Sequence, residues 1–137
     1  MPAVGDVKLN PGRADYPEEG YRSRFDHATE KAVPGYYEVI LDDYGIKAQL
    51  TATQRTGIHK YTFPKGKDGH LILDLVHGIY NYDGKVLWAN LRVENDTLLT
   101  GYRITNGWAR TNYTYFAISL SQPIKDYGYK DKEKVLY

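Results

Sequence analysis

The sequence predicts an all-β fold, an antiparallel β-sandwich that occupies residues 1–137 as a single domain. From Gly35 onward, short runs of strand-forming residues recur roughly every eight to twelve residues, which is the spacing of sandwich strands. The chain has 14 tyrosines against 3 phenylalanines, and tyrosine favours strands whose outer face is wet. Hydrophobic residues make up 42% of the chain, which is enough for one domain with its own core.

The first third of the chain combines loops with clear strands. Residues 4–9 resemble the end of a strand, and residues 10–34 are rich in proline, glycine and charge, which predicts a loop with one helical turn over 28–32. Two strands then flank a tight turn at residues 42–45. Apolar and polar residues alternate strictly over 46–53, which predicts a strand with one buried face.

The middle of the chain predicts two more strands. The first covers residues 58–63 and ends at Pro64, and the second covers residues 70–76. A turn is expected at residues 81–84, where an Asp-Gly pair favours positive φ. A last strand is expected over 113–121, and residues 135–137 resemble the start of another. We therefore expect about seven strands and no long helix.

A hairpin over residues 86–105 has the most clearly defined pattern. With Asn95-Asp96 as a two-residue turn, Val93 faces Leu98 and one face of the hairpin is mostly apolar, which fixes the register. In this register Trp88 lies directly opposite Arg103 on the other face. The predicted apolar face consists of the pairs Val93–Leu98, Leu91–Thr100, Ala89–Tyr102 and Leu87–Ile104.

Composition excludes several classes of function. The formal net charge is +1 and both signs are scattered, so we expect no nucleic-acid partner. No apolar run reaches the length of a membrane span, so we expect no membrane partner. The absence of cysteine excludes disulfides, thiol catalysis and cysteine-bound zinc. The amino terminus does not resemble a signal peptide, and both ends interrupt a strand pattern, so we expect an excerpt of a larger protein.

Trp88 and Arg103 are candidate substrate-binding residues. An indole opposite a guanidinium forms a cation–π pair worth roughly 0.5–1 kcal/mol when exposed. One hypothesis is a sugar platform, in which the indole contacts the C–H face of a pyranose while Arg103 and Asn90 bind its hydroxyl groups. The other is a sheet face covered by a neighbouring domain or loop, which is the more common use of such mixed faces.

The carboxylates and histidines form no recognisable catalytic or metal site. Asp42 and Asp43 are adjacent and so point to opposite faces of a strand; they cannot flank one glycosidic bond, and a role in the turn is favoured. Asp74 is expected in the middle of a strand, where a buried, paired carboxylate is more often structural than catalytic. No spacing among the histidines presents two ligands on one face; they are His27, His59, His70 and His77. We predict no catalytic residue and no metal ligand in this chain.

Several segments between about residue 21 and residue 121 form a distinctive set, which is densest around the run Leu-Asp-Asp-Tyr-Gly-Ile at 41–46 and Leu-Thr-Ala-Thr at 50–53. Together these motifs resemble the amino-terminal β domain of glycoside hydrolase family 92, the calcium-dependent exo-acting α-mannosidases. One departure is Asp26, where the resemblance leads us to expect a small hydroxyl residue. The other matching segments are Tyr21–Phe25 with His27, Pro34–Tyr37, Arg55, Gly57, His59, Tyr61, Phe63 and Ile72–Leu75.

The resemblance implies a bacterial, periplasmic or surface-exposed parent protein with an amino-terminal β-supersandwich and an intramolecular partner, a carboxy-terminal (α/α)₆ barrel. The parent would hydrolyse terminal α-linked mannose, often α-1,2-linked, from mannose-rich glycans with inversion. Calcium would bind the sugar hydroxyls in the parent, and no cofactor is expected in this chain. Because the family's acid, base and calcium ligands lie mainly in the helical domain, no catalytic residue carries over, and we expect the chain alone to be inactive.

Two other functions remain open at this stage. The chain is a free-standing carbohydrate-binding module if Trp88, Arg103 and Trp108 form its platform. It is a structural scaffold between domains if it binds no glycan and exposes an apolar docking patch. If the chain is an excerpt, missing edge strands leave open edges that can pair between copies, which makes a dimer of this chain possible.

Overall fold

A computed structural model describes residues 1–78, 82, 84–131 and 134–136 of the chain. The chain divides into two units, Met1–Leu73 and Asp74–Tyr137. In both units every strand pair of the described residues is antiparallel, so the prediction of an all-β antiparallel fold is confirmed. The only helices among these residues are two 3₁₀ helices of three residues each. Within the part of the chain that is described, therefore, no helix is both long and apolar enough to cross a membrane.

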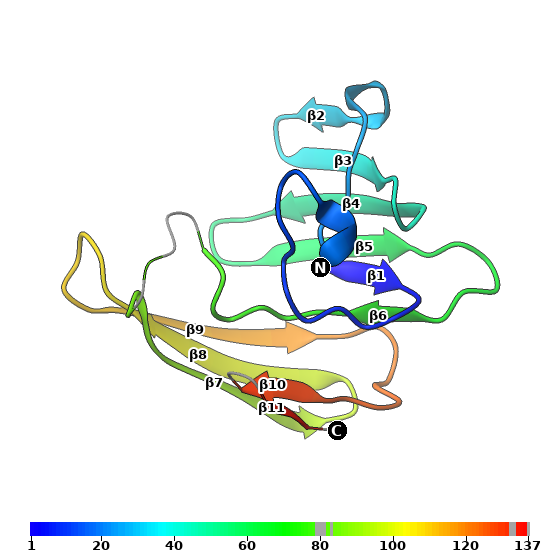
Figure 1. The fold of residues 1–137 in the computed structure, drawn as a ribbon. Helices are drawn as coiled ribbons and strands as arrows, with labels where there is room; N and C mark the ends of the chain where they lie inside the picture. The colour runs from blue at the N-terminus through cyan, green and yellow to red at the C-terminus, as the bar shows by residue number, and fades with distance from the viewer. Residues whose placement is uncertain (79–81, 83, 132–133, 137) are drawn as a thin grey trace. The chain divides into compact units, whose positions relative to one another are not determined.

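The first unit contains a four-stranded sheet and a separate two-stranded sheet (Figure 1). The four-stranded sheet has the order β2 (Lys31–Val33), β3 (Tyr36–Leu41), β4 (Ile46–Ala52) and β5 (Gly57–Thr62). The two-stranded sheet pairs β1 (Pro2–Val4) with β6 (Gly69–Leu71). The two 3₁₀ helices, η1 (Pro17–Glu19) and η2 (His27–Thr29), lie in the segment between β1 and β2.

The core of the first unit follows from the alternation seen in the sequence. Val39 pairs with Ala48 across β3 and β4, and both are buried. Ile46, two residues before Ala48 and on the same face of β4, is fully buried. Lys47 and Gln49 point to the other face and are only half-buried. The predicted strand over residues 46–53 is thus confirmed, with its apolar face inward.

Several predicted elements of this region differ from the structure. The first strand is Pro2–Val4 rather than residues 4–9. The predicted helical turn over residues 28–32 is replaced by η2, after which Lys31–Val33 already forms strand β2. The reason is local: the Asp26 side chain accepts a hydrogen bond from the Ala28 backbone N–H at 2.8 Å, which caps a single turn. The short strand then gains its partner, β3.

Asp74 does not lie in the middle of a strand, because the predicted strand over residues 70–76 ends at Leu71. Asp74 Oδ1 instead accepts hydrogen bonds from the backbone N–H groups of Val76 at 2.8 Å and His77 at 2.7 Å. A side chain that binds the backbone two and three residues ahead forms a turn and competes with strand pairing. The alternation of leucines in this segment was therefore a misleading signal.

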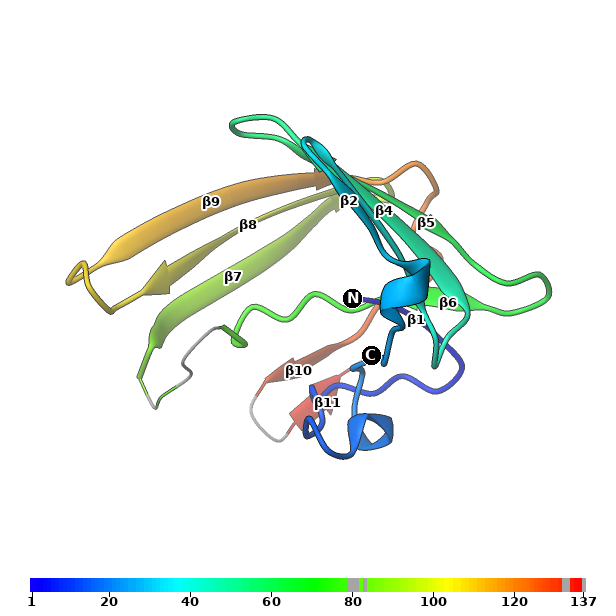
Figure 2. The same ribbon diagram turned by 90° about the horizontal axis from the view of Figure 1, so that it is seen from above.

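The second unit contains the sheet β7 (Val86–Asn95), β8 (Leu98–Thr105) and β9 (Asn112–Ser119), in that order. These strands lie side by side in both views (Figure 1 and Figure 2). A separate hairpin pairs β10 (Tyr129–Asp131) with β11 (Lys134–Leu136). Residues 81 and 83 of the turn predicted at residues 81–84 lie outside the described part. In the described residues of this segment, the Lys85 N–H donates a hydrogen bond to the Tyr82 carbonyl at 3.1 Å, and Gly84 has a positive φ of 81°.

The register of the β7–β8 hairpin differs by one residue from the prediction. Val93 faces Leu99 rather than Leu98, and the turn residues are Asp96 and Thr97 rather than Asn95 and Asp96. The Asn95 side chain accepts a hydrogen bond from the Thr97 N–H at 2.9 Å, which moves the turn forward by one residue. A turn moved by one residue shifts the pairing by two residues, and the irregularity between Val93 and Asn95 takes back one of them. The irregularity between Val86 and Trp88 removes the remaining shift, so that Val86 faces Thr105.

Candidate functional site

Trp88 lies on the face of the β7–β8–β9 sheet that carries most of its exposed aromatic side chains. It pairs with Ile104 on β8, and Ile104 pairs with Tyr113 on β9. Residues directly opposite each other in antiparallel strands share a face, so these three form one row across the sheet. The next row on the same face consists of Asn90, Tyr102 and Tyr115.

We define the Trp88 face by these two rows together with the row after them. Trp88 is 61% exposed, Tyr113 58% and Tyr115 72%, whereas Tyr102 is half-buried. The rings of Tyr102 and Tyr115 have centroids 5.7 Å apart. The residues of the Trp88 face are Trp88, Ile104, Tyr113, Asn90, Tyr102, Tyr115, Arg92, Thr100 and Ala117.

Arg103 lies on the opposite face, so the predicted Trp88–Arg103 pair is wrong. Arg103 faces Ala89, and one of its terminal nitrogens donates to the Val76 carbonyl at 3.3 Å. Its Nε atom is buried and has no hydrogen-bond partner within the described residues. The one-residue shift of the hairpin register separates the two side chains, because neighbouring positions on a strand point to opposite faces.

Trp108 lies away from the sheet, in the loop between β8 and β9, and its side chain is fully exposed. Of the three predicted site residues, only Trp88 therefore lies on the Trp88 face. The tyrosines at positions 102, 113 and 115 were not among the predicted site residues. The tyrosine excess and the alternation of Tyr113 and Tyr115 with Thr114 and Phe116 were the signals that could have identified them.

The polar residues at the end of the Trp88 face neutralise each other. Arg92 Nε lies 3.2 Å from a carboxylate oxygen of Glu94, and the Thr100 hydroxyl donates to the other carboxylate oxygen at 2.6 Å. The ion pair leaves no net charge beside the aromatic side chains, and the amide of Asn90 adds a neutral donor and acceptor.

Several carboxylates of the first unit form hydrogen bonds and ion pairs that connect its turns and strands. Asp43 lies in the predicted turn and accepts hydrogen bonds from the Arg24 backbone N–H at 2.6 Å and from Arg24 Nε at 3.0 Å. The Arg24 side chain lowers the pKa of Asp43. The prediction that Asp42 and Asp43 serve a turn is thus confirmed, and their turn is anchored to residues 23 and 24.

Two glutamates of the first unit have similar environments. Glu30 accepts a hydrogen bond from the Tyr37 hydroxyl at 2.6 Å, which lowers the pKa of Glu30, and the nearby His27 lowers this pKa further. A hydrogen bond from the Tyr36 hydroxyl lowers the pKa of Glu38, and Lys47, 2.9 Å away, adds to this effect. Every resolved carboxyl shift in the described residues is therefore downward.

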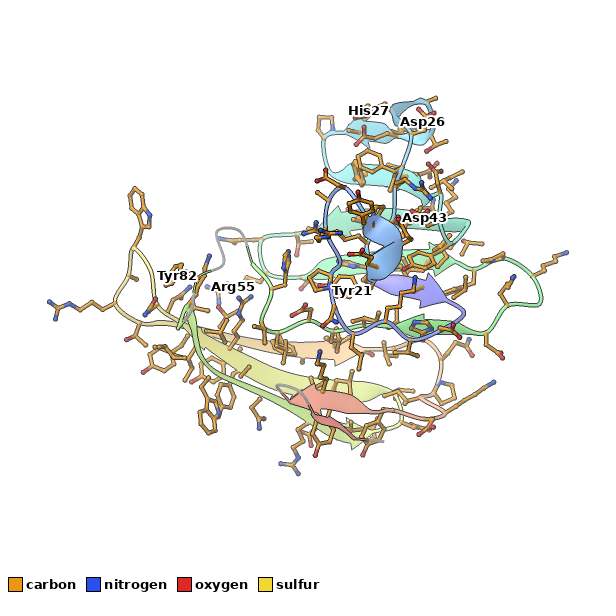
Figure 3. All side chains as sticks on the ribbon, in the orientation of Figure 1. Tyr21, Asp26, His27, Asp43, Arg55 and Tyr82 are labelled. Atoms are coloured by element: carbon orange, nitrogen blue, oxygen red, sulfur yellow. The ribbon has the colours of Figure 1, made fainter. Side chains whose placement is uncertain are left out.

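His27, His59 and His70 lie in three different local environments. His27 lies beside Asp26 at the start of η2 (Figure 3), and His59 contacts the Tyr61 hydroxyl at 2.7 Å. Burial lowers the pKa of His70, whose Nε2 has no hydrogen-bond partner among the residues that the structure describes. The described ranges contain no group of three or more His, Asp or Glu side chains that could hold a metal ion.

Comparisons with known proteins agree with this architecture. Residues 1–136 match the model of the glycosyl hydrolase family 92 N-terminal domain. The structure of a family GH92 α-mannosidase from Bacteroides thetaiotaomicron is similar over 98% of this chain, with a TM-score of 0.88 and 34% sequence identity. Its complex with mannoimidazole gives a TM-score of 0.87 at the same identity. The chain spans 18% and 17% of the lengths of these two matched chains. No curated protein sequence matches it.

Proposed function

Because the chain belongs to the glycosyl hydrolase family 92 N-terminal domain family, we propose that it forms part of a longer exo-acting α-mannosidase. The observation that carries this proposal is the 34% identity, over 98% of the chain, to a protein described as a GH92 α-mannosidase. The substrates would be mannose-rich glycans, and α-1,2-linked mannose is the terminal residue that we expect to be removed. The longer protein would act in the periplasm or at the surface of a bacterium.

In this proposal the chain supports catalysis without supplying the catalytic carboxyl groups. An inverting glycosidase needs a general acid with a raised pKa and a general base about 6.5–9.5 Å from it. The three described carboxyl groups with shifted pKa values, Glu30, Glu38 and Asp43, are all shifted downward. Each is held by hydrogen-bond donors of its own unit, which suits an anchoring role.

The proposal includes calcium, which the family resemblance implies for the longer protein. The described part of this chain offers no group of three or more His, Asp or Glu side chains that fits a metal ion. Calcium prefers six to eight oxygen ligands, so we assign the ligands to the rest of the longer protein. No step of the reaction is assigned to a residue of this chain.

Hydrolysis of mannobioses by the longer protein tests the finer parts of this proposal. We expect the α-1,2-linked disaccharide to be cleaved faster than the α-1,3- and α-1,6-linked ones, and we expect EDTA to stop the reaction and added calcium to restore it. Proton NMR during the first minutes should show the β-anomer of mannose, the product of inversion. Release of the α-anomer would contradict inversion, and full activity in EDTA would contradict the calcium requirement.

A further inference from the structure

The two faces of the β7–β8–β9 sheet have different chemistry. The face opposite the Trp88 face is the more buried and more aliphatic of the two: Leu99 is buried, Val93, Phe116 and Ile118 are half-buried, and Leu91 is 40% exposed. The Trp88 face instead combines aromatic rings with hydroxyl and amide groups, and three of its rings are more than half exposed. The two faces therefore differ in both burial and chemistry, with aliphatic side chains on one and exposed aromatic and polar side chains on the other.

The dimensions of the Trp88 face suit a chain of sugar rings. Trp88 and Tyr113 are two strands apart, which is about 10 Å at a strand spacing of about 4.8 Å. Tyr102 and Tyr115 form the next row, about 7 Å along the strands. An aromatic surface of this size has room for more than one pyranose ring.

The chemical groups on the face also suit sugars. An aromatic ring presents a negative face to the slightly positive C–H groups of a pyranose, and Asn90 and the tyrosine hydroxyls can exchange hydrogen bonds with sugar hydroxyls. Arg92 is the one charged residue of this face, and its ion pair with Glu94, at the end of the face, leaves no net charge for an anionic ligand among the described residues. The ligand that complements this surface is therefore neutral and amphipathic.

We propose that the Trp88 face binds a neutral oligosaccharide whose pyranose rings lie flat on Trp88, Tyr113 and Tyr115. The identification of the sugar as an α-mannoside rests on the proposed function. The face then holds mannose-rich glycan on the surface of the longer enzyme and raises the local concentration of the glycan's terminal mannose residues.

A permanent protein layer on this face is the competing explanation. Such a layer would bury the hydroxyl groups of Tyr102, Tyr113 and Tyr115, and each would need a partner to offset a loss of about 1–3 kcal/mol. A surface that stays in water between encounters with sugar has no such requirement. The observed side chains therefore favour a transient, hydroxyl-rich ligand over a packed protein partner.

The two tryptophans of the chain allow a direct test. In a ¹⁵N-labelled sample of the 137-residue chain, titration with α-1,2-mannotetraose should shift the indole N–H signal of Trp88 and leave that of Trp108 in place. Binding measured by calorimetry should weaken at least tenfold in Trp88→Ala, which corresponds to about 1.4 kcal/mol, and also in Tyr115→Ala. Trp108→Ala is the matched control and should bind like the wild type.

Three outcomes would overturn the proposal. The first is no shift of the Trp88 signal with mannotetraose or any other neutral oligosaccharide. The second is a loss of affinity in Trp108→Ala equal to that in Trp88→Ala. The third is a Trp88 signal that shifts in the 137-residue chain but not in the longer protein, because the rest of that protein covers Trp88. Shifts with another neutral glycan but not with α-mannosides would retain the sugar-binding face and contradict the α-mannosidase assignment. Because the NMR titration uses the wild-type chain, a variant that fails to fold does not affect the result.

Discussion

Substitution of Gly101 by alanine is expected to destabilise the β7–β8–β9 sheet. Gly101 pairs with Leu91 on β7 and with Phe116 on β9. A Cβ atom at position 101 would lie 2.4 Å from the backbone carbonyl oxygen of Asn90 and 2.5 Å from Cζ of the Phe116 ring. Both distances are well inside the van der Waals contact distance of about 3.5–4.0 Å between carbon atoms. The glycine is therefore required for space, because the Phe116 ring lies across it.

The expected cost follows from these two contacts. Overpacking typically costs about 1–3 kcal/mol, and the contact with the Asn90 oxygen places Gly101→Ala in the upper part of that range, because backbone cannot turn aside. Alanine also restricts the unfolded chain, which offsets about 0.4–1 kcal/mol. We therefore expect a net loss of about 2 kcal/mol in the free energy of unfolding.

Urea unfolding followed by circular dichroism measures this loss, with Gly57→Ala as the matched control. The nearest atom to a Cβ at Gly57 is His59 Nε2 at 3.5 Å, an ordinary contact, so this variant should match the wild type or exceed it slightly. In a Phe116→Ala background, Gly101→Ala should cost less than in the wild type, because only the Asn90 contact remains. A cost within about 0.5 kcal/mol of that of Gly57→Ala would refute this explanation.

Three further changes test the packing and the anchoring of the first unit. Ile46→Ala should lower the free energy of unfolding by about 2–5 kcal/mol because Ile46 is fully buried. Ile58→Ala, at an exposed position, should stay within about 0.5 kcal/mol of the wild type. Equal losses for the two variants in urea unfolding would contradict the assigned core. The pKa of Asp43 is lowered in the folded state. The ionised Asp43 therefore contributes to the free energy of unfolding above its unfolded pKa of about 3.9, and this contribution is lost as pH falls through its pKa in the folded state. The stability difference between wild type and Asp43→Asn should therefore narrow between pH 7 and pH 3, and a difference that grows towards acid would be contrary to the Arg24 contact. Asp26→Ser should retain the cap of η2, whereas Asp26→Ala should lower the free energy of unfolding by about 0.5–1 kcal/mol. Thermal melts in which the two variants coincide would argue against the cap.

Strict alternation was the most reliable signal in the sequence. The strand over residues 46–52 was predictable because every second residue is apolar, and the structure buries the first two of these residues, Ile46 and Ala48. The same reasoning failed at Asp74, because one side-chain oxygen binds two backbone N–H groups and stops the strand. Short strands such as β1 and β2 have too few residues to show a period and become visible only through their partners.

The candidate site was predictable only in part. Trp88 was identified, but its neighbours depended on a register that the displaced turn and the irregularity between Val93 and Asn95 together shift by one residue. A shift of one residue exchanges the two faces of a strand relative to its partner. The residue opposite Trp88 is therefore Ile104 and not the predicted Arg103. The rings of Tyr113 and Tyr115 come from β9, whose pairing with β8 depends on long-range contacts that the periodicity of one strand does not specify.

The most direct measurement is the release of free mannose from α-1,2-mannobiose by the longer protein and by the 137-residue chain, assayed side by side with calcium. We expect release by the longer protein, and we expect the chain to give no more mannose than a buffer blank. Release by the isolated chain would contradict its assignment as a non-catalytic part. No release by the longer protein from any mannobiose would contradict the α-mannosidase assignment itself.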